Sequence, residues 1–215
     1  MVSIAKCGAG LKSASGSWGR VRHAAMPAAV CGLVLAGQGF VSAQGQTLQR
    51  GIDVIRQSLA KDGVYERTTT TTRGNYKSET RRKFSLSEAD GCKLVVVSES
   101  HIHTEMPKQN RVTDRRWSDI YHPDFTTMDP ATATVIPPEP PQATWETKGY
   151  LVRISIETGQ PLMIGSTVDP ATNQARDMPG VPTLAVYVTS KETADRLAKA
   201  FAEVATACRA NPTGK

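Results

Sequence analysis

Two histidines and two glutamates alternate along one short segment, and they are the side chains of this sequence best suited to chemistry. Glu99, His101, His103 and Glu105 are each two positions apart. In a β-strand, residues two positions apart point to the same face of the sheet. Two imidazoles on one face can share a zinc ion, and a third ligand leaves one position open for water. His122 or a glutamate could be that ligand, and the predicted metal site is His101, His103 and His122.

The residues between these polar side chains support a second interpretation. Leu94, Val96, Ile102 and Met106 occupy alternate positions of the same segment. The segment therefore has one apolar and one polar face, which is typical of an antiparallel strand with one side in water. This pattern favours a solvated strand face, and the metal site stands as the alternative.

A basic stretch over 108–116 is a second place where the residue types suggest binding. Its arginines are Arg111, Arg115 and Arg116. Guanidinium groups beside the ring of Trp117 suit an acidic partner, a phosphate or a lipid headgroup. Asp114 and Asp119 dilute the positive charge. We therefore expect a solvated loop, with anion binding as the alternative.

The sequence lacks the short motifs that mark many catalytic sites. It contains no G-x-S-x-G, Walker loop, dinucleotide fingerprint, C-x-x-C or H-E-x-x-H. After residue 43 the chain has three histidines and two cysteines. These are few residues from which to build a hydrolytic triad. These absences favour a non-enzymatic protein without a cofactor.

The first 43 residues have the pattern of a secretory signal peptide. Four basic residues precede an apolar run over 24–36, and small residues follow up to Ala43. The run is too short to span a bilayer, which takes about 20 residues. We predict cleavage after Ala43, export to the bacterial periplasm or the medium, and no transmembrane span in the mature chain. A lipoprotein attached through Cys31 is the alternative.

Removing this leader changes what the charge and the cysteines imply. The leader holds four of the 26 Lys and Arg residues and none of the 20 Asp and Glu residues, so 22 and 20 remain. That near balance removes the argument for a nucleic-acid partner. Cys7 and Cys31 leave with the leader. We predict that Cys92 and Cys208 form a disulfide, with two buried thiols as the alternative.

The rest of the pattern predicts a helix at each end and six or seven strands between them. Leu48, Ile52, Ile55 and Leu59 recur at helical spacing, which predicts a short helix over 44–63. The expected strands are Val64–Tyr76, Thr80–Leu86, Cys92–Met106, Trp117–Thr127, Tyr150–Ile156, Leu162–Val168 and Thr183–Val188, with Met128–Ile136 as a short addition. The proline-rich stretch 137–141 reads as an exposed connection, and 169–182 as a polar loop.

The last helix has the clearest signals. Thr189–Glu192 has the pattern of a capping box, with Thr189 as the expected N-cap. The apolar positions on one face are Leu197, Phe201, Val204 and Cys208. The element order predicts an α+β fold, in which antiparallel strands form a small curled sheet or barrel covered by the long amphipathic C-terminal helix. The expected organisation is a signal peptide over 1–43, a short helix over 44–63, one β-rich domain over 64–209 and a tail over 210–215.

Two segments carry a resemblance to a known superfold. The stretch TRRKFSLSEADGCKLVVV resembles the first hairpin of pleckstrin-homology-like domains, and the helix ETADRLAKAFAEVATAC follows the last strand as in that superfold. The chain resembles small exported bacterial proteins of unknown function with this fold. A phosphoinositide site would use Arg81, Arg82 and Lys83, although the final helix lacks the Trp that classical members usually carry.

The function expected from the sequence is an exported, non-enzymatic binding domain at the cell envelope. Its partner would be a protein, a peptide or a lipid. One alternative is a metal-binding protein or metal-dependent hydrolase that uses His101 and His103. The other alternative is a structural envelope protein that needs no pocket. A superfold hosts many functions, so the fold does not choose among them.

Overall fold

The structure is a computed structural model that describes residues 43–71 and 75–212, and its elements belong to the compact unit Phe40–Lys215. The elements are α1 (Ala43–Asp62), β1 (Val64–Thr70), β2 (Lys77–Asp90), β3 (Lys93–Met106), η1 (Pro107–Gln109), β4 (Arg111–His122), β5 (Met128–Ile136), β6 (Trp145–Lys148), β7 (Tyr150–Ile156), β8 (Ile164–Asp169), β9 (Gln174–Asp177), β10 (Thr183–Val188) and α2 (Lys191–Ala210). The predicted signal peptide lies outside the described residues, except for Ala43 at the start of α1.

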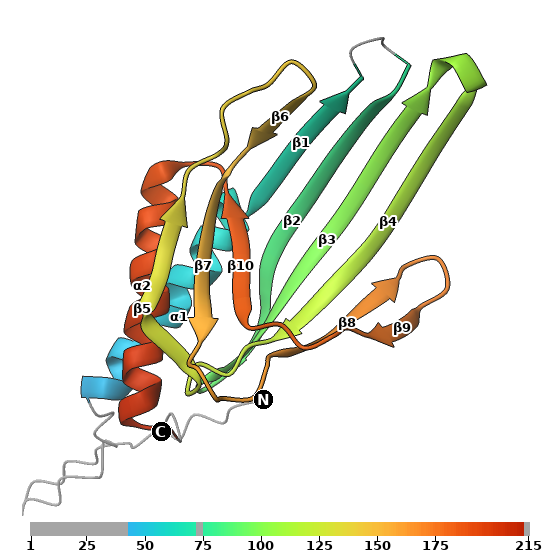
Figure 1. The fold of residues 1–215 in the computed structure, drawn as a ribbon. Helices are drawn as coiled ribbons and strands as arrows, with labels where there is room; N and C mark the ends of the chain where they lie inside the picture. Colours follow the sequence, from blue (N-terminus) through green and yellow to red (C-terminus); the bar gives the residue numbers. More distant parts are fainter. Residues whose placement is uncertain (1–42, 72–74, 213–215) are drawn as a thin grey trace, which may run out of the picture. The chain divides into compact units, whose positions relative to one another are not determined.

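The strands form two antiparallel sheets (Figure 1). The larger sheet has the order β6-β1-β2-β3-β4-β8-β9, and the smaller has the order β10-β7-β5. Two helices with antiparallel sheets make this an α+β fold, as the element order predicts. Neither sheet closes on itself, so the expectation of a barrel is wrong.

Each helix buries one apolar stripe against the other helix and the sheets. The predicted stripe residues of both helices are all buried: Leu48, Ile52, Ile55, Leu59, Leu197, Phe201, Val204 and Cys208. The two helices approach closely at Gly51, where a Cβ would lie 2.6 Å from Cγ2 of Val204. The ring of Phe201 packs against Phe125, with ring centroids 5.8 Å apart. Helix α2 is thereby fixed between α1 and the sheets.

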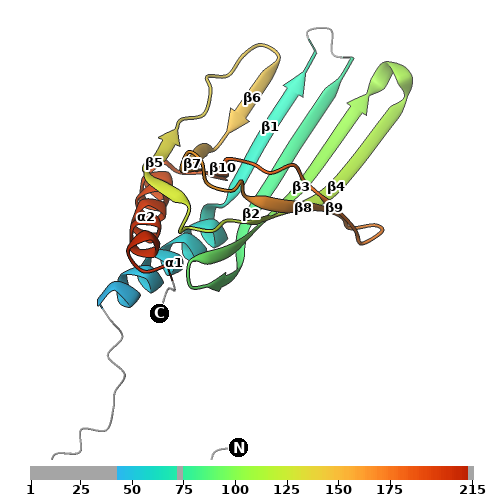
Figure 2. The same cartoon turned by 60° about the horizontal axis from the view of Figure 1, so that its bottom comes forward.

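The strands β2, β3 and β4 continue well beyond the part of the sheet that lies beside the helices (Figures 1 and 2). Near the helices, the paired residues Leu86 and Val96 are buried in the core. Farther along, the same face carries paired hydroxyl side chains such as Ser78 and Thr104. We call the side that carries Phe84, Leu94 and Val96 the inner face, and the part beyond Phe84 the extended half.

Several strand bounds differ from the expectation. The basic stretch 108–116 is not a loop: η1 turns the chain, and β4 begins at Arg111 and pairs with β3 along its whole length. The strands β6 and β9 were not predicted, and β9 lies in the expected polar loop 169–182. These segments are extended because their backbones pair with neighbouring strands. Their sequences show no alternation of apolar residues, so they could not be recognised as strands.

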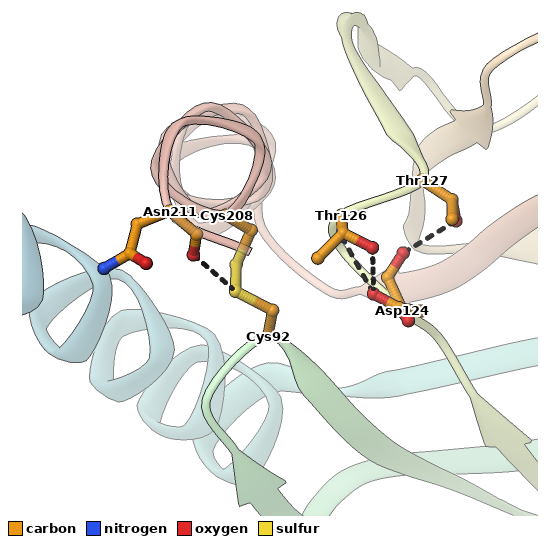
Figure 3. The surroundings of a disulfide bond; sticks show 6 residues. All are labelled: Cys92, Asp124, Thr126, Thr127, Cys208 and Asn211. Carbon is orange, nitrogen blue, oxygen red and sulfur yellow. Dashed lines mark hydrogen bonds between the residues drawn. A yellow bond between two sulfur atoms is a disulfide. The ribbon is translucent and has the colours of Figure 1, made fainter. Parts of the chain in front are cut away.

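The predicted disulfide between Cys92 and Cys208 is present (Figure 3), with Cα atoms 5.6 Å apart. Cys92 lies in the turn between β2 and β3, next to Gly91, whose φ of 56° suits this tight connection. The carbonyl oxygen of Cys92 also accepts a hydrogen bond of 2.8 Å from the backbone N–H of Phe125. The β2–β3 turn, the segment after β4 and the end of α2 therefore meet at one point.

The start of α2 is held by side chains from both helices. Ser190 is the N-cap, one residue later than expected, and its Oγ accepts a hydrogen bond of 3.2 Å from the N–H of Thr193. The hydroxyl of Thr193 donates to the carboxylate of Asp62, the last residue of α1. A carboxylate at this end of α2 also complements the helix dipole.

We expect that replacing both cysteines, Cys92→Ser with Cys208→Ser, lowers the free energy of unfolding by about 2–5 kcal/mol, because the disulfide closes a long loop in the unfolded chain. Urea unfolding of the oxidised protein measures this. The unchanged protein unfolded in reductant is the matched control. Alkylation of both cysteines in unreduced, denatured protein would contradict the disulfide.

Replacement of the N-cap, Ser190→Ala, should destabilise the protein by about 1 kcal/mol, since the N–H of Thr193 loses its acceptor. The neighbouring Thr189→Ala is the control, and we expect it to stay within about 0.5 kcal/mol of the unchanged protein because Thr189 is exposed. Thermal or urea unfolding of both variants tests this. A larger loss of stability in Thr189→Ala than in Ser190→Ala would mean that Thr189 is the N-cap.

Candidate functional site: the inner face of the sheet

The outer face of the extended half carries the histidine cluster expected from the sequence. His103 lies between two carboxylates, with Nδ1 3.0 Å from Oδ1 of Asp114 and Nε2 3.2 Å from Oε1 of Glu105. The Nε2 of His101 is 2.9 Å from the same Asp114 oxygen. The imidazoles therefore meet carboxylates of their own sheet, and the charges on this face neutralise one another.

His122 does not join this cluster. His101 pairs across the ladder with Arg116, and His122 lies six residues farther along β4, roughly 20 Å away at about 3.4 Å per residue. Within residues 43–71 and 75–212, no group of three or more His, Cys, Asp or Glu side chains is placed to hold a metal ion. The structure thus brings His101 and His103 together and leaves the third predicted ligand apart.

Other charges on the outer face are also paired. Lys77 Nζ lies 2.6 Å from Oε1 of Glu79, and Arg81 Nε lies 3.6 Å from Oε1 of Glu66. Acidic and basic side chains alternate across these strands, as on an ordinary solvated surface. Such exposed pairs add little stability individually. Their effect is to leave the outer face without a strong charge of one sign.

The inner face of the extended half has a different composition. Its register places hydroxyl side chains of β1, β2, β3 and β4 in one patch, with arginines and aromatic rings around them. The hydroxyl residues are Thr69, Ser78, Thr80, Thr104 and Thr113. The arginines are Arg67, Arg82, Arg111 and Arg115. These side chains define what we call the arginine face.

The arginine face has few acidic groups to neutralise it. Among the described residues, none of its four arginines is in an ion pair within 4.0 Å. Arg67 instead lies over the ring of Trp145, with its guanidinium carbon 5.3 Å from the ring centroid. Asp119 is the acid of this face on β4, and it accepts hydrogen bonds from Trp117 (3.1 Å) and Thr167 (2.7 Å). The face is therefore positive and open to an anion.

Three buried polar atoms mark the row where the arginine face meets the core. The Nε of Arg82 and the hydroxyls of Ser98 and Ser100 have no hydrogen-bond partner within the described part of the chain. Ser98 is 1% exposed and Ser100 is 4% exposed. Buried polar groups in native proteins are usually paired with protein or water, so this row is unusual.

Aromatic side chains border the same row. Tyr65 packs on Tyr187 with ring centroids 4.4 Å apart, and Tyr65 pairs across the ladder with Arg82. Burial raises the pKa of both Tyr121 and Tyr187, while the positive charge of Arg82 partly opposes the rise. Both phenols are therefore neutral donors at physiological pH. They add hydrogen-bonding groups beside the arginines.

Two hollows lie on or beside the arginine face. One, of about 360 Å³, is lined by Arg67, Arg115 and the hydroxyl patch between them. The other, of about 880 Å³, lies between β4 and the β8–β9 hairpin, where Arg115, Trp117 and Arg176 line it. Arg115 belongs to both. The two hollows are therefore neighbouring candidate sites for anionic groups.

The sequence indicated this site only in part. The cluster of Arg111, Arg115 and Trp117 was noticed, but as a loop, and Arg116 turned out to face the opposite side. Arg67 and Arg82 join the others only through the pairing of β1 with β2 and of β2 with β3. The usable signal was the repeated hydroxyl side chains at alternate positions, which mark a polar face continuing an apolar one.

Comparison of the chain with protein-family models, with curated proteins and with solved structures finds no match. In the described part of the chain, no helix is long and apolar enough to cross a membrane.

The histidine cluster predicts a pH dependence. The pKa of His103 is raised above its ordinary 6.5. The main cause is its hydrogen bond with Asp114, and the second is its hydrogen bond with Glu105. The stability from this group is present below about pH 6.5 and is lost as the pH rises through the raised pKa. We expect the effect to be small, because the group is in contact with solvent.

An NMR titration of the His103 ring tests this directly. We expect a midpoint above 6.5, and a lower midpoint in Asp114→Asn, which removes the main carboxylate charge. The variant His103→Gln should lose the small decline in stability between about pH 6 and pH 8. A His103 midpoint at or below 6.5 would contradict the cluster geometry.

Proposed function

We propose that this chain is an exported binding domain of the bacterial cell envelope, and that its arginine face binds an anionic partner. The observation that carries the proposal is the difference between the two sides of one sheet. On the outer face, acids and bases are mixed, and Lys77, Arg81 and His103 each lie within 4.0 Å of a carboxylate. On the inner face, four arginines surround hydroxyl groups without an ion pair among the described residues.

The chemistry of this face suits carboxylate, phosphate or sulfate groups. A guanidinium group donates several hydrogen bonds in a fixed plane and matches such oxyanions in a bidentate manner. Hydroxyl groups between the arginines donate further hydrogen bonds. A rigid sheet fixes the spacing of these donors, which lowers the entropy lost when a ligand binds.

Export is supported by the disulfide between Cys92 and Cys208, because such bonds persist in oxidising compartments. The likeness to pleckstrin-homology-like domains is part of the proposal as well. An antiparallel sheet followed by an amphipathic C-terminal helix supports it, whereas the open sheets differ from the closed barrel of that superfold. The binding role does not depend on this likeness.

Retention on immobilised dextran sulfate tests the binding face. We expect the variant Arg67→Gln with Arg115→Gln to bind about tenfold more weakly, because each lost pair in contact with water is worth roughly 0.2–1 kcal/mol. The matched control is Lys83→Gln with Lys148→Gln, which removes the same charge from the outer face of β2 and β6. We expect the control to keep most of the affinity.

Two outcomes would refute the proposal. Equal losses in the two double variants would mean that dextran sulfate responds only to net charge. No retention of the unchanged protein at low salt would mean that the arginine face does not bind polyanions. Circular dichroism of each variant verifies that the fold is retained.

A further inference from the structure

The strand β4 has a free edge over half its length. On one side, β4 pairs with β3 from Arg111 to Tyr121, but on the other side β8 pairs only with Ser118–His122. Within the described residues, no strand pairs with the second edge of Arg111–Trp117. Every second residue of such an edge directs its backbone N–H and C=O outward, ready to pair with another strand.

A groove lies along this free edge. The β8–β9 hairpin turns away from β4 after Asp169, and the space of about 880 Å³ between them is lined by both elements. The walls include Arg116 and Trp117 from β4, and Arg176 from β9. On β4 the groove borders only Asp114–Trp117. The whole free edge of seven residues spans about 24 Å at 3.4 Å per residue, which is the length of a short extended peptide.

The charge of the edge selects the kind of peptide. Arg111 and Arg115 point to the inner face and Arg116 to the outer face. The acids of the groove are already engaged: Asp114 contacts both histidines, and Oδ1 of Asp169 accepts a hydrogen bond from the N–H of Ala171. Three guanidinium groups therefore face an incoming strand.

The same charges disfavour a second copy of this chain as the occupant. When two such edges pair antiparallel about Asp114, the midpoint of Arg111–Trp117, Asp114 of one copy lies opposite Asp114 of the other. Arg115 then lies opposite Thr113, which offers it no acidic partner. Like charges directly opposite each other destabilise a strand pair. An acidic strand meets no such repulsion.

We propose that the free edge of β4 binds an extended acidic peptide segment, which adds a strand to the seven-stranded sheet. Glutamate or aspartate side chains lie opposite Arg111, Arg115 and Arg116, and the backbone of the segment pairs with Arg111–Trp117. Main-chain hydrogen bonds give affinity, and the alternate side chains give specificity. The inference rests on the proposed function, because it names the partner of the same arginine face.

The test uses a capped peptide, Val-Glu-Glu-Thr-Thr-Val-Glu, whose glutamates lie opposite the three arginines in antiparallel pairing. Two further peptides have the same sequence but carry backbone N-methyl groups, on the odd or on the even residues. The amides of one set point toward β4 and those of the other away. We expect one methylated peptide to bind at least about tenfold more weakly and the other to bind as the parent does, because methylation removes several hydrogen bonds only in the first.

Charge reversal provides the second arm. The variant Arg111→Glu with Arg115→Glu should bind the glutamate peptide at least about tenfold more weakly than the unchanged protein does. It should instead bind a peptide in which lysine replaces each glutamate. The control Lys83→Glu with Lys148→Glu, on the outer face, should keep the original preference. Isothermal titration calorimetry measures all combinations.

The outcomes separate the two proposals. If all three peptides bind equally while dextran sulfate still depends on Arg67 and Arg115, strand addition is refuted and the anion-binding function stands. If neither the polyanion nor any peptide binds, both are refuted. If the protein alone sediments as a dimer that the double charge reversal dissociates, the occupant of the edge is a second copy and the inference is overturned.

Discussion

The packing of α2 against α1 and the bases of the two sheets is the interaction on which the rest of the structure depends. Both helices bury their apolar stripes there, and the Cys92–Cys208 disulfide closes the same region. A helix of 20 residues extends about 30 Å, whereas a strand of 14 residues extends about 48 Å. The helices therefore stabilise one part of the long strands, and the remaining part is held by its neighbours in the sheet.

This constraint explains why the inner face changes character along a single strand. In β3, Leu94 and Val96 face the core, and the next residues on that side are Ser98 and Ser100. Ser98 and Ser100 are still buried, but farther from the helices the same side of the sheet carries exposed charged residues such as Arg111 and Arg115 of β4. The polar side chains of that surface do not pack in the core, so they are available to contact a ligand.

The sequence predicted the parts of the fold that depend on burial. The stripe of α2 and the alternation in β7 repeat at fixed spacings, and the stripe is buried together with Val152 and Ile154 of β7. It did not predict β4 from Arg111 or the strands β6 and β9, because their extended form comes from pairing with neighbouring strands. The arginine face was missed for the same reason. Arg67, Arg82 and Arg115 are far apart in sequence, and only the strand register brings them to one side.

The position of the disulfide has a mechanical consequence. Cys92 lies at the base of the β2–β3 hairpin, and the candidate binding face lies toward the opposite ends of these strands (Figures 1 and 3). A force applied at those ends would pass along β2 and β3 to the turn at Cys92. The covalent bond to Cys208 would transmit that force to α2, so the helical layer would anchor the long strands.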